Sequence, residues 1–311
     1  MLGEATSVAI FAHVHPDGDA IGSTLALYNY TRENFPNVRA NVFLEPFPEK
    51  FNILRGTESV KNAYTDEEAD LVFLLDTPSF ERIGANGKAA LARASLTCNI
   101  DHHVSNPGNL CKTCIVESDS SSASETLFTL LSKEKIGKNT ANALYLGIVH
   151  DTGVFKFSNT RRRTMDIVGT LIEKGCEFDR IINETYYSRT HRATKITGFA
   201  MERSEVALNG KVVYSFLHPE DLKRFDATPL DLSSVIDALR EVSGTEVALF
   251  VYPTESGYKL SLRSNYTVDV NAIARTLGGG GHVRAAGATV QEPPEAVIPK
   301  ILEMVRAQLS L

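Results

Sequence analysis

The stretch that decides the fold is 8–23, VAIFAHVHPDGDAIGS. It opens with an apolar run, Val8 to Ala12, that is typical of a buried strand, and it passes through proline and glycine into an amphipathic segment. Four side chains with metal-ligating atoms lie at the turn: His13, His15, Asp17 and Asp19. Because ligands bind at the carboxyl ends of strands in an open α/β sheet, the sequence predicts a ligand site that begins here.

The length and composition are those of a soluble globular protein with about two domains. The chain has 311 residues, of which 43% are hydrophobic and 23% charged. Its net charge of -6 argues against a broadly basic nucleic-acid-binding surface but leaves room for a local basic cleft. No apolar run approaches the roughly 18 residues of a membrane helix. The N-terminus lacks the basic region of a signal peptide, so we expect a cytoplasmic protein.

The four cysteines do not form the disulfide framework of a small secreted domain. Cys111 and Cys114 have the CxxC spacing of half a zinc site, but no second half follows at zinc-finger spacing. We therefore interpret them as ordinary strand residues, with structural zinc or redox chemistry as the minor alternative.

Strands and helices alternate through the first half of the chain. Apolar runs predict strands at 8–12, 40–44, 70–75, 96–100 and 114–117. Helical patterns lie at 20–33, 88–94, 121–133, 141–149 and 164–173, the third of them with a capping signal at 119–120. This alternation predicts an α/β fold, a mostly parallel sheet with helices on both faces.

The second half has a different pattern, that of a smaller α+β domain. Asn209-Gly210 between two apolar runs indicates a hairpin. A second strand pair is expected at 246–252 and 258–263, and helices at 230–242, 269–277 and 294–309, with a flexible glycine loop at 278–281. We predict a catalytic domain over 1–185, a helical linker over 186–203 and the second domain over 204–311.

Further potential ligands follow the ends of other elements. Asp76 follows the strand at 70–75, the Asp101-His102-His103 run follows the strand at 96–100, and Asp151 ends a helix. Each aspartate alone could cap a helix or form a turn. Neighbouring strands lie about 4.8 Å apart, so the groups at their ends can converge. Mixed carboxylate and imidazole ligands suit Mn²⁺, Fe²⁺, Co²⁺ or Mg²⁺, and this many ligands favour two ions bridged by one carboxylate.

Four segments resemble the four motifs of the DHH phosphoesterase family. They are HVHPDGDAIGS (13–23), LLDTPSFERIG (74–84), NIDHHVSN (99–106) and GIVHDTGVFKFSNT (147–160). The segment SLRSNYTVDVNAIARTLGGGGHVRAAG (261–287) resembles the DHHA1 domain that follows the catalytic domain in one branch of this family. Together they span nearly the whole chain, and within the family they are most similar to the bacterial nanoRNases and pAp phosphatases.

The resemblance implies an assignment of ligands to two ions. The first ion would be held by His13, Asp17 and Asp76. The second would be held by Asp19, Asp76, His102 and Asp151, so that Asp76 bridges. His103 would face the substrate phosphate, and Asp101 would orient a histidine. The histidines at 15 and 150 depart from the family pattern and receive no role.

The resemblance also implies a substrate-binding group in the second domain. Its members would be Arg263, Ser264, Gly280, Gly281, His282 and Arg284. Glycine backbone can approach an anion closely, and arginine supplies positive charge. We expect the second domain to fold over the first, with a short substrate between them.

The implied function is that of a metal-dependent phosphoesterase. Two divalent ions, Mn²⁺ first with Mg²⁺ or Co²⁺ as alternatives, would activate water for attack on nanoRNA, a linear dinucleotide such as pGpG, or the 3′-phosphate of pAp. A pyrophosphatase or exopolyphosphatase activity is the alternative, followed by a non-catalytic nucleotide-binding module. The preferred substrate, the cleavage polarity, the base preference, the native metal and the oligomeric state, a homodimer included, are left open.

Overall fold

The computed structural model describes residues 1–65 and 69–310. The chain forms two compact units, Met1–Ser188 and Arg189–Leu311. The domain limits at 185 and 203 remain a prediction.

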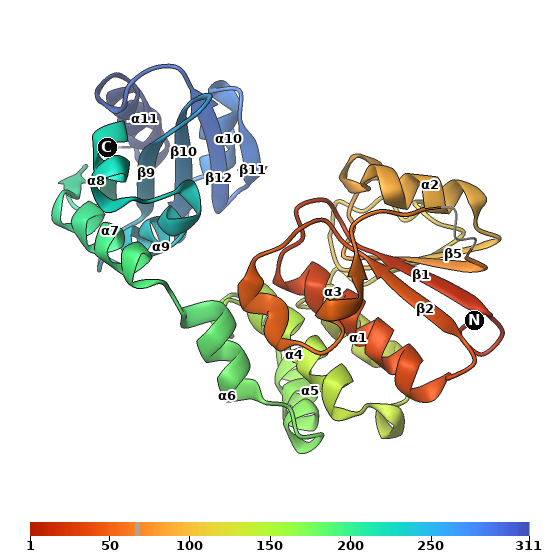
Figure 1. The fold of residues 1–311 in the computed structure, drawn as a ribbon. Coiled ribbons are helices and arrows are strands. Elements are labelled where there is room, and N and C mark those ends of the chain that lie inside the picture. The colour runs from red at the N-terminus through yellow and green to blue at the C-terminus, as the bar shows by residue number, and fades with distance from the viewer. Residues whose placement is uncertain (66–68, 311) are drawn as a thin grey trace. The chain divides into compact units, whose positions relative to one another are not determined.

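The first unit is built on a six-stranded sheet in the order β3-β2-β1-β4-β5-β6 (Figure 1). Every strand pair in it is parallel. The strands are β1 (Ser7–Phe11), β2 (Arg39–Phe43), β3 (Val60–Lys61), β4 (Leu71–Leu75), β5 (Leu96–Asp101) and β6 (Thr113–Val116). The first strand, β1, therefore lies in the middle of the sheet, and its carboxyl end is flanked by those of β2 and β4.

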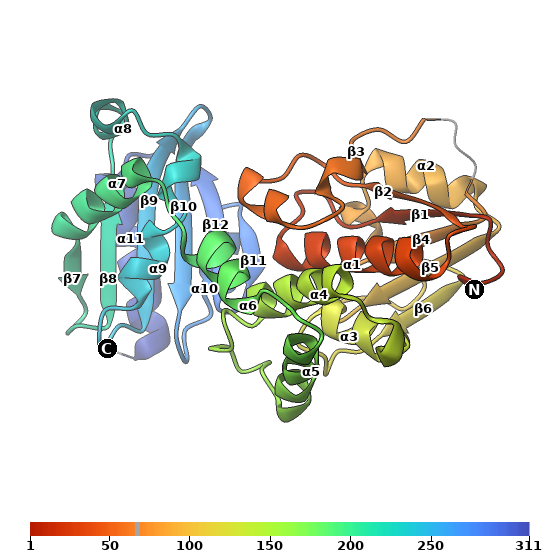
Figure 2. The same ribbon diagram turned by 60° about the horizontal axis from the view of Figure 1, so that its bottom comes forward.

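Helices cover both faces of this sheet, as expected from the alternating pattern. The helices of this unit are α1 (Gly18–Asn34), α2 (Ala85–Arg93), α3 (Ala123–Leu130), α4 (Lys138–Asp151), α5 (Arg162–Glu173) and α6 (Phe178–Ile181). One apolar cluster joins α1, α3 and α4 to one face of the sheet, with Ile10 and Phe73 among its members. A smaller cluster joins α2 to the opposite face through Phe11 and Ala90. Figures 1 and 2 show α2 apart from the layer that contains α1.

Two helical segments differ in detail from the sequence pattern. The helix expected from 121 begins at Ala123, because the Ser122 side chain accepts a hydrogen bond from the Glu125 backbone and caps the helix. The helical stretch expected over 186–203 is interrupted. A π-helical segment, Ile182–Tyr187, ends at an extended Ser188, and α7 (His191–Glu202) begins after the Thr190 cap.

The second unit contains a six-stranded sheet in the order β11-β12-β10-β9-β8-β7. Its strands are β7 (Glu205–Ala207), β8 (Val212–Phe216), β9 (Val247–Thr254), β10 (Gly257–Ser264), β11 (Gly280–His282) and β12 (Ala285–Val290). All pairs are antiparallel except β8 with β9. The helices after α7 are α8 (Pro219–Phe225), α9 (Val235–Arg240), α10 (Val270–Thr276) and α11 (Pro294–Leu309). Both predicted strand pairs, including the hairpin around Asn209-Gly210, are confirmed, and so is the α+β class.

Two predictions in this unit are wrong. The helix expected over 230–242 is split into a 3-10 turn, Pro229–Leu232, and α9. The glycine run is not a flexible loop, since Gly280 and Gly281 pair with β12. A Cβ at Gly279 would lie 2.2 Å from the Gly287 carbonyl oxygen. A Cβ at Gly281 would lie 2.5 Å from the Ala285 carbonyl oxygen. These glycines allow close approach of two backbones.

Among the described residues, no helix has both the length and the hydropathy required to cross a lipid bilayer.

Candidate metal centre

Side chains from five elements meet at the carboxyl edge of the first sheet. Ligand atoms lie within 4.8 Å of one another in three overlapping groups: His13, Asp17 and Asp76; Asp19, His102 and Asp151; and Asp76, Asp101, His102 and His103. The strands β1, β4 and β5 end at this edge, α1 begins there and α4 ends there. All six predicted metal ligands, together with Asp101 and His103, are thus brought into one cluster.

Asp76 lies at the centre of the cluster and is almost fully buried, with 2% of its surface exposed. One oxygen, Oδ2, is 3.5 Å from His13 Nε2. The other, Oδ1, is 3.5 Å from His102 Nε2 and has no hydrogen-bond partner. A buried acceptor without a partner costs about 1–3 kcal/mol. Divalent ions on the two sides of this carboxylate would satisfy both oxygens, so the residues fit a two-metal centre.

The backbone at Asp76 is also unusual, because its φ of 50° lies in the left-handed region. A non-glycine residue in this region is strained, and such strain is often found at functional sites. The Asp76 amide donates to the Ile100 carbonyl oxygen at 3.0 Å, which holds this conformation at the end of β4.

Asp17 is the N-cap of α1 and also faces His13. Its Oδ1 accepts hydrogen bonds from the backbone of Asp19 and Ala20 at 3.0 and 3.1 Å. Its Oδ2 lies 3.7 Å from His13 Nε2. The other ring nitrogen, Nδ1, is 2.8 Å from the Val14 carbonyl oxygen, and the Arg82 guanidinium lies beside it at 2.7 Å. Nε2 faces the carboxylates of Asp17 and Asp76, so it is the ring nitrogen in position to bind a metal ion.

Asp19 is held by a second helix that is distant in sequence. Its two oxygens accept from the Ala123 and Ser124 amides, at 2.6 and 3.0 Å, at the N-terminus of α3. Helix N-termini stabilise anions through such free amide groups. Burial and, after it, the charge of Asp76 raise the pKa of Asp19 to about 7. The sequence did not reveal this contact, and only the capping signal at 119–120 indicated a helix start nearby.

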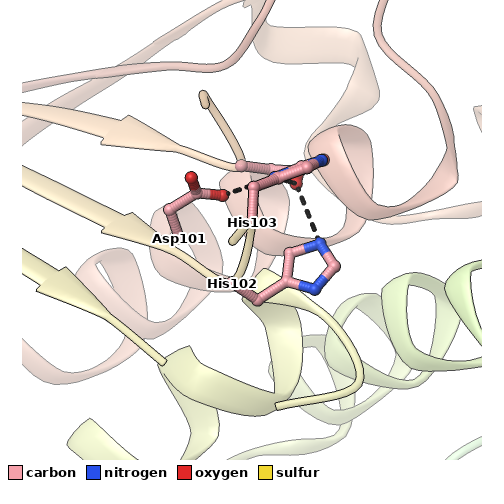
Figure 3. Close-up of side chains that lie close together, drawn as sticks. Asp101, His102 and His103 are labelled. Carbon is pink, nitrogen blue, oxygen red and sulfur yellow. Dashed lines mark hydrogen bonds and ion pairs between the residues drawn. The ribbon is translucent and has the colours of Figure 1, made fainter. Parts of the chain in front are cut away.

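Asp101 is fully buried and holds His103 (Figure 3). His103 Nδ1 lies 2.8 Å from Asp101 Oδ1. The Asn106 side-chain amide donates to Asp101 Oδ2 at 2.6 Å and to Asn99 Oδ1 at 2.8 Å. This arrangement directs the Nε2 atom of His103 away from Asp101. Asn106 is the last residue of the segment NIDHHVSN (99–106), and its residue type alone does not indicate this role.

The ionisable side chains of the cluster shift one another's pKa values. Burial lowers the pKa of His13 and of His102, yet their carboxylate neighbours outweigh it and raise both pKa values to about 10. Burial raises the pKa of Asp76, but the nearby imidazolium rings of His13 and His102 outweigh it, so the pKa falls below its usual range. Burial and the charge of Asp19 raise the pKa of Asp151. Metal-free protein therefore carries protons on both histidines, and metal ions must displace them.

The two histidines without an assigned role lie outside the ligand groups. The His15 side chain is 90% exposed and lies 3.5 Å from Glu45. His150 contacts Thr185 through Nε2 at 2.9 Å, and its ring packs against Phe51 and Tyr186. Burial lowers the pKa of His150 to about 4, so it is neutral. Its contacts are those of a packing residue between helices.

The cysteines take no part in the ligand clusters of the described residues. All four thiols are free. The Cys111 amide donates to Cys114 Sγ at 3.4 Å, at the start of the edge strand β6.

The predicted substrate-binding residues of the second unit lie around β11 and the end of β10. His282 and Arg284 are exposed, as are Gly280 and Gly281. Arg263 is half-buried, and its Nη1 donates to the Leu262 carbonyl oxygen at 3.0 Å. Burial lowers its pKa. Ser264 is only 3% exposed, and its hydroxyl donates to the Val268 carbonyl oxygen. The serine thus holds the following loop, and substrate binding by the group remains a prediction.

Family models of known proteins match residues in both units of the chain. The family model described as DHH family, N-terminal domain, matches residues 7–148, and that of the DHHA1 domain matches 209–311. The bifunctional oligoribonuclease and PAP phosphatase NrnA of Bacillus subtilis (strain 168) is 30% identical over 298 residues, which cover 93% of this chain and 91% of that protein. This chain belongs to the DHH phosphoesterase family.

Two further proteins show how widely the likeness extends. The protein of the same name from Thermus thermophilus is 28% identical over 310 residues, covering 97% of this chain and 90% of that one. A crystal structure of an exopolyphosphatase-related protein from Bacteroides fragilis has a TM-score of 0.92 and 26% identity, covering 100% of this chain and 95% of that chain. The DHH and DHHA1 organisation expected from the motifs is confirmed.

Proposed function

We propose that this DHH-family enzyme hydrolyses phosphoester bonds in short oligonucleotides and in pAp, using two Mn²⁺ ions. The observation that carries the proposal is the buried Asp76 carboxylate between two sets of ligands, one of its oxygens without a hydrogen-bond partner. The choice of substrate is supported by relatives that are named oligoribonuclease and PAP phosphatase. This chain matches them over about nine tenths of their length. A cytoplasmic location remains part of the proposal.

The chain supplies ligands, orientation and a hydrogen-bond donor. One ion would be held by His13, Asp17 and Asp76, and the other by Asp19, Asp76, His102 and Asp151. When bound, such a pair of ions neutralises phosphate charge and lowers the pKa of water, which provides a nucleophile near neutral pH.

His103 would contact the substrate itself. Asp101 accepts from its Nδ1 at 2.8 Å and fixes the orientation of the ring. The Nε2 atom would then donate to a phosphate oxygen as negative charge develops there. Asn106 occupies the second Asp101 oxygen, which keeps the carboxylate in its orientation.

A second candidate function is hydrolysis of pyrophosphate or polyphosphate. It is favoured by the likeness to the exopolyphosphatase-related protein, which extends over the whole chain. A non-catalytic nucleotide-binding module fits less well, because the complete set of predicted ligands is present and clustered.

A substrate panel separates these functions. Labelled 2- to 5-mers, a 24-mer, pAp, pyrophosphate and polyphosphate are each incubated with Mn²⁺ and with EDTA. We expect rapid Mn²⁺-dependent hydrolysis of the short oligonucleotides and pAp, with little activity on the 24-mer. His15→Asn is the matched control for a ligand variant such as His13→Asn, because His15 lies at the same turn but is exposed. Hydrolysis confined to pyrophosphate or polyphosphate would contradict the proposal.

A further inference from the structure

The second unit presents an exposed aromatic side chain on a fixed loop. Tyr266 is 74% exposed and lies between β10 and α10, and its neighbour Thr267 is exposed as well. A single exposed apolar residue is ordinary on a protein surface. Side-chain hydrogen bonds hold the backbone of the loop that carries Tyr266.

A buried carboxylate fixes the backbone on the C-terminal side of the ring. Glu246 is 5% exposed, and its Oε1 accepts from the amides of Thr267 and Val268 at 2.7 and 2.8 Å. The Tyr266 amide lies 3.4 Å from the same oxygen. Hydrogen bonds to a charged acceptor are stronger than neutral ones, so this part of the loop is held firmly.

A second set of bonds fixes the N-terminal side. The Asn265 side-chain amide donates to the carbonyl oxygens of Arg240 and Thr245 at 3.2 and 2.8 Å. The Ser264 hydroxyl donates to the Val268 carbonyl oxygen at 2.7 Å and closes the loop. The backbone at Tyr266 is therefore held from both sides, and the ring retains only its own side-chain rotations. Such a residue offers contact area at a low entropic cost.

The loop lies beside the positively charged end of β11 and β12. The Ser264 amide donates to the Arg284 carbonyl oxygen, and the Val270 amide to that of Val283, both at 3.0 Å. Arg284 Nη1 donates to the Val268 carbonyl oxygen at 3.0 Å. Tyr266 and the exposed Arg284 thus lie on two loops that these hydrogen bonds join.

We propose that Tyr266 stacks on a nucleobase of the substrate while Arg284 contacts a neighbouring phosphate. Aromatic rings stack on all bases, and guanidinium groups bind phosphate through several N–H donors. The inference rests on the proposed function for its substrate class, and it makes Tyr266 a specificity-determining residue. It selects nucleotides over pyrophosphate and polyphosphate, which have no base.

Binding is tested directly with a new fluorophore, because the chain contains no tryptophan. Tyr266→Trp is titrated with a hydrolysis-resistant phosphorothioate dinucleotide, and then with pyrophosphate. We expect saturable quenching by the dinucleotide and none by pyrophosphate. Leu230→Trp is the matched control, because Leu230 is 84% exposed in the same unit but on a different element. Equal quenching of the two variants, or none in either, would overturn the inference.

Kinetics provide the second test. Tyr266→Ala should raise KM for a dinucleotide about 5- to 150-fold, the range that corresponds to loss of one stacked base, with kcat unchanged. Tyr266→Phe should remain near wild type, and so should Val206→Ala, which alters another exposed residue of this unit. Wild-type protein without activity on dinucleotides would contradict the proposed function, and the fluorescence titration would still decide the inference. An active wild type with an unchanged KM in Tyr266→Ala would overturn the inference alone.

Discussion

Gly147→Ala removes no ligand, yet it should damage the metal centre. A Cβ at this position of α4 would lie 2.4 Å from Asp19 Oδ1 and 2.0 Å from Ser124 Oγ. Ordinary contact begins at 3.4 Å, so the Asp19 oxygen would have to move by about 1 Å. That carboxylate is held by amide bonds of 2.6 and 3.0 Å from α3. A shift of this size would break or lengthen both bonds and displace a predicted ligand.

The expected cost follows from these contacts. Overpacking a dense core costs about 1–3 kcal/mol, and each hydrogen bond to a charged group is worth about 1.5–3 kcal/mol. Because the helices can separate slightly, we expect the free energy of unfolding to fall by about 2–4 kcal/mol. Mn²⁺ affinity should fall about 10- to 100-fold, as it does when groups that orient metal ligands are lost.

The assays are urea denaturation of the metal-free protein and calorimetric titration with Mn²⁺. Gly169→Ala in α5 is the control, because a Cβ there would meet no atom within 4 Å. Alanine at a free helical position should raise stability by about 0.5–1 kcal/mol and leave metal binding unchanged. If Gly147→Ala behaved like Gly169→Ala in both assays, the contact of α4 with Asp19 would not control the centre.

Two further predictions concern protons and turnover. His103→Ala should retain Mn²⁺ binding but lose most of its turnover, and a loss of metal instead would show that His103 is a ligand. Because the pKa values of His13 and His102 are raised to about 10, their ion pairs stabilise the metal-free protein at neutral pH, and this stabilisation is lost as the pH rises through 10. Mn²⁺ must displace these protons, so its affinity should rise with pH, with at least two protons released per chain at pH 7.5, measured by calorimetry in buffers of different ionisation enthalpy. A pH-independent affinity would contradict this.

Much of the first unit could be predicted because its strands are short, buried and separated by helices. Parallel strands place their carboxyl ends on one edge, so the side chains at 76, 102 and 103 could be expected beside the turn that begins at His13. This inference needs only the order of the elements. It does not need their detailed packing.

Contacts between distant segments could not be predicted in this way. Asp19 and Ser124 are far apart in sequence, and their contact depends on the packing of α1, α3 and α4. The role of Gly147 has the same origin, because a glycine inside a helix pattern does not show which neighbour requires it. Asn106 lies in a recognised motif, but its bond to Asp101 depends on how the chain folds back after β5.

The glycine run at 278–281 illustrates a second limit. Glycine serves both flexible loops and close backbone approach, and the local sequence does not distinguish these uses. The pairing of Gly280 and Gly281 with β12 became evident only from the sheet.

The central claim is that one buried carboxylate, Asp76, joins two metal ions. The most direct test is the count of bound Mn²⁺ by elemental analysis, together with the electron paramagnetic resonance spectrum, in wild type and Asp76→Asn. We predict two ions per wild-type chain with the spectrum of a spin-coupled pair, and loss of the coupled signal in the variant. One uncoupled ion per wild-type chain, or a coupled pair that survives in Asp76→Asn, would contradict the account.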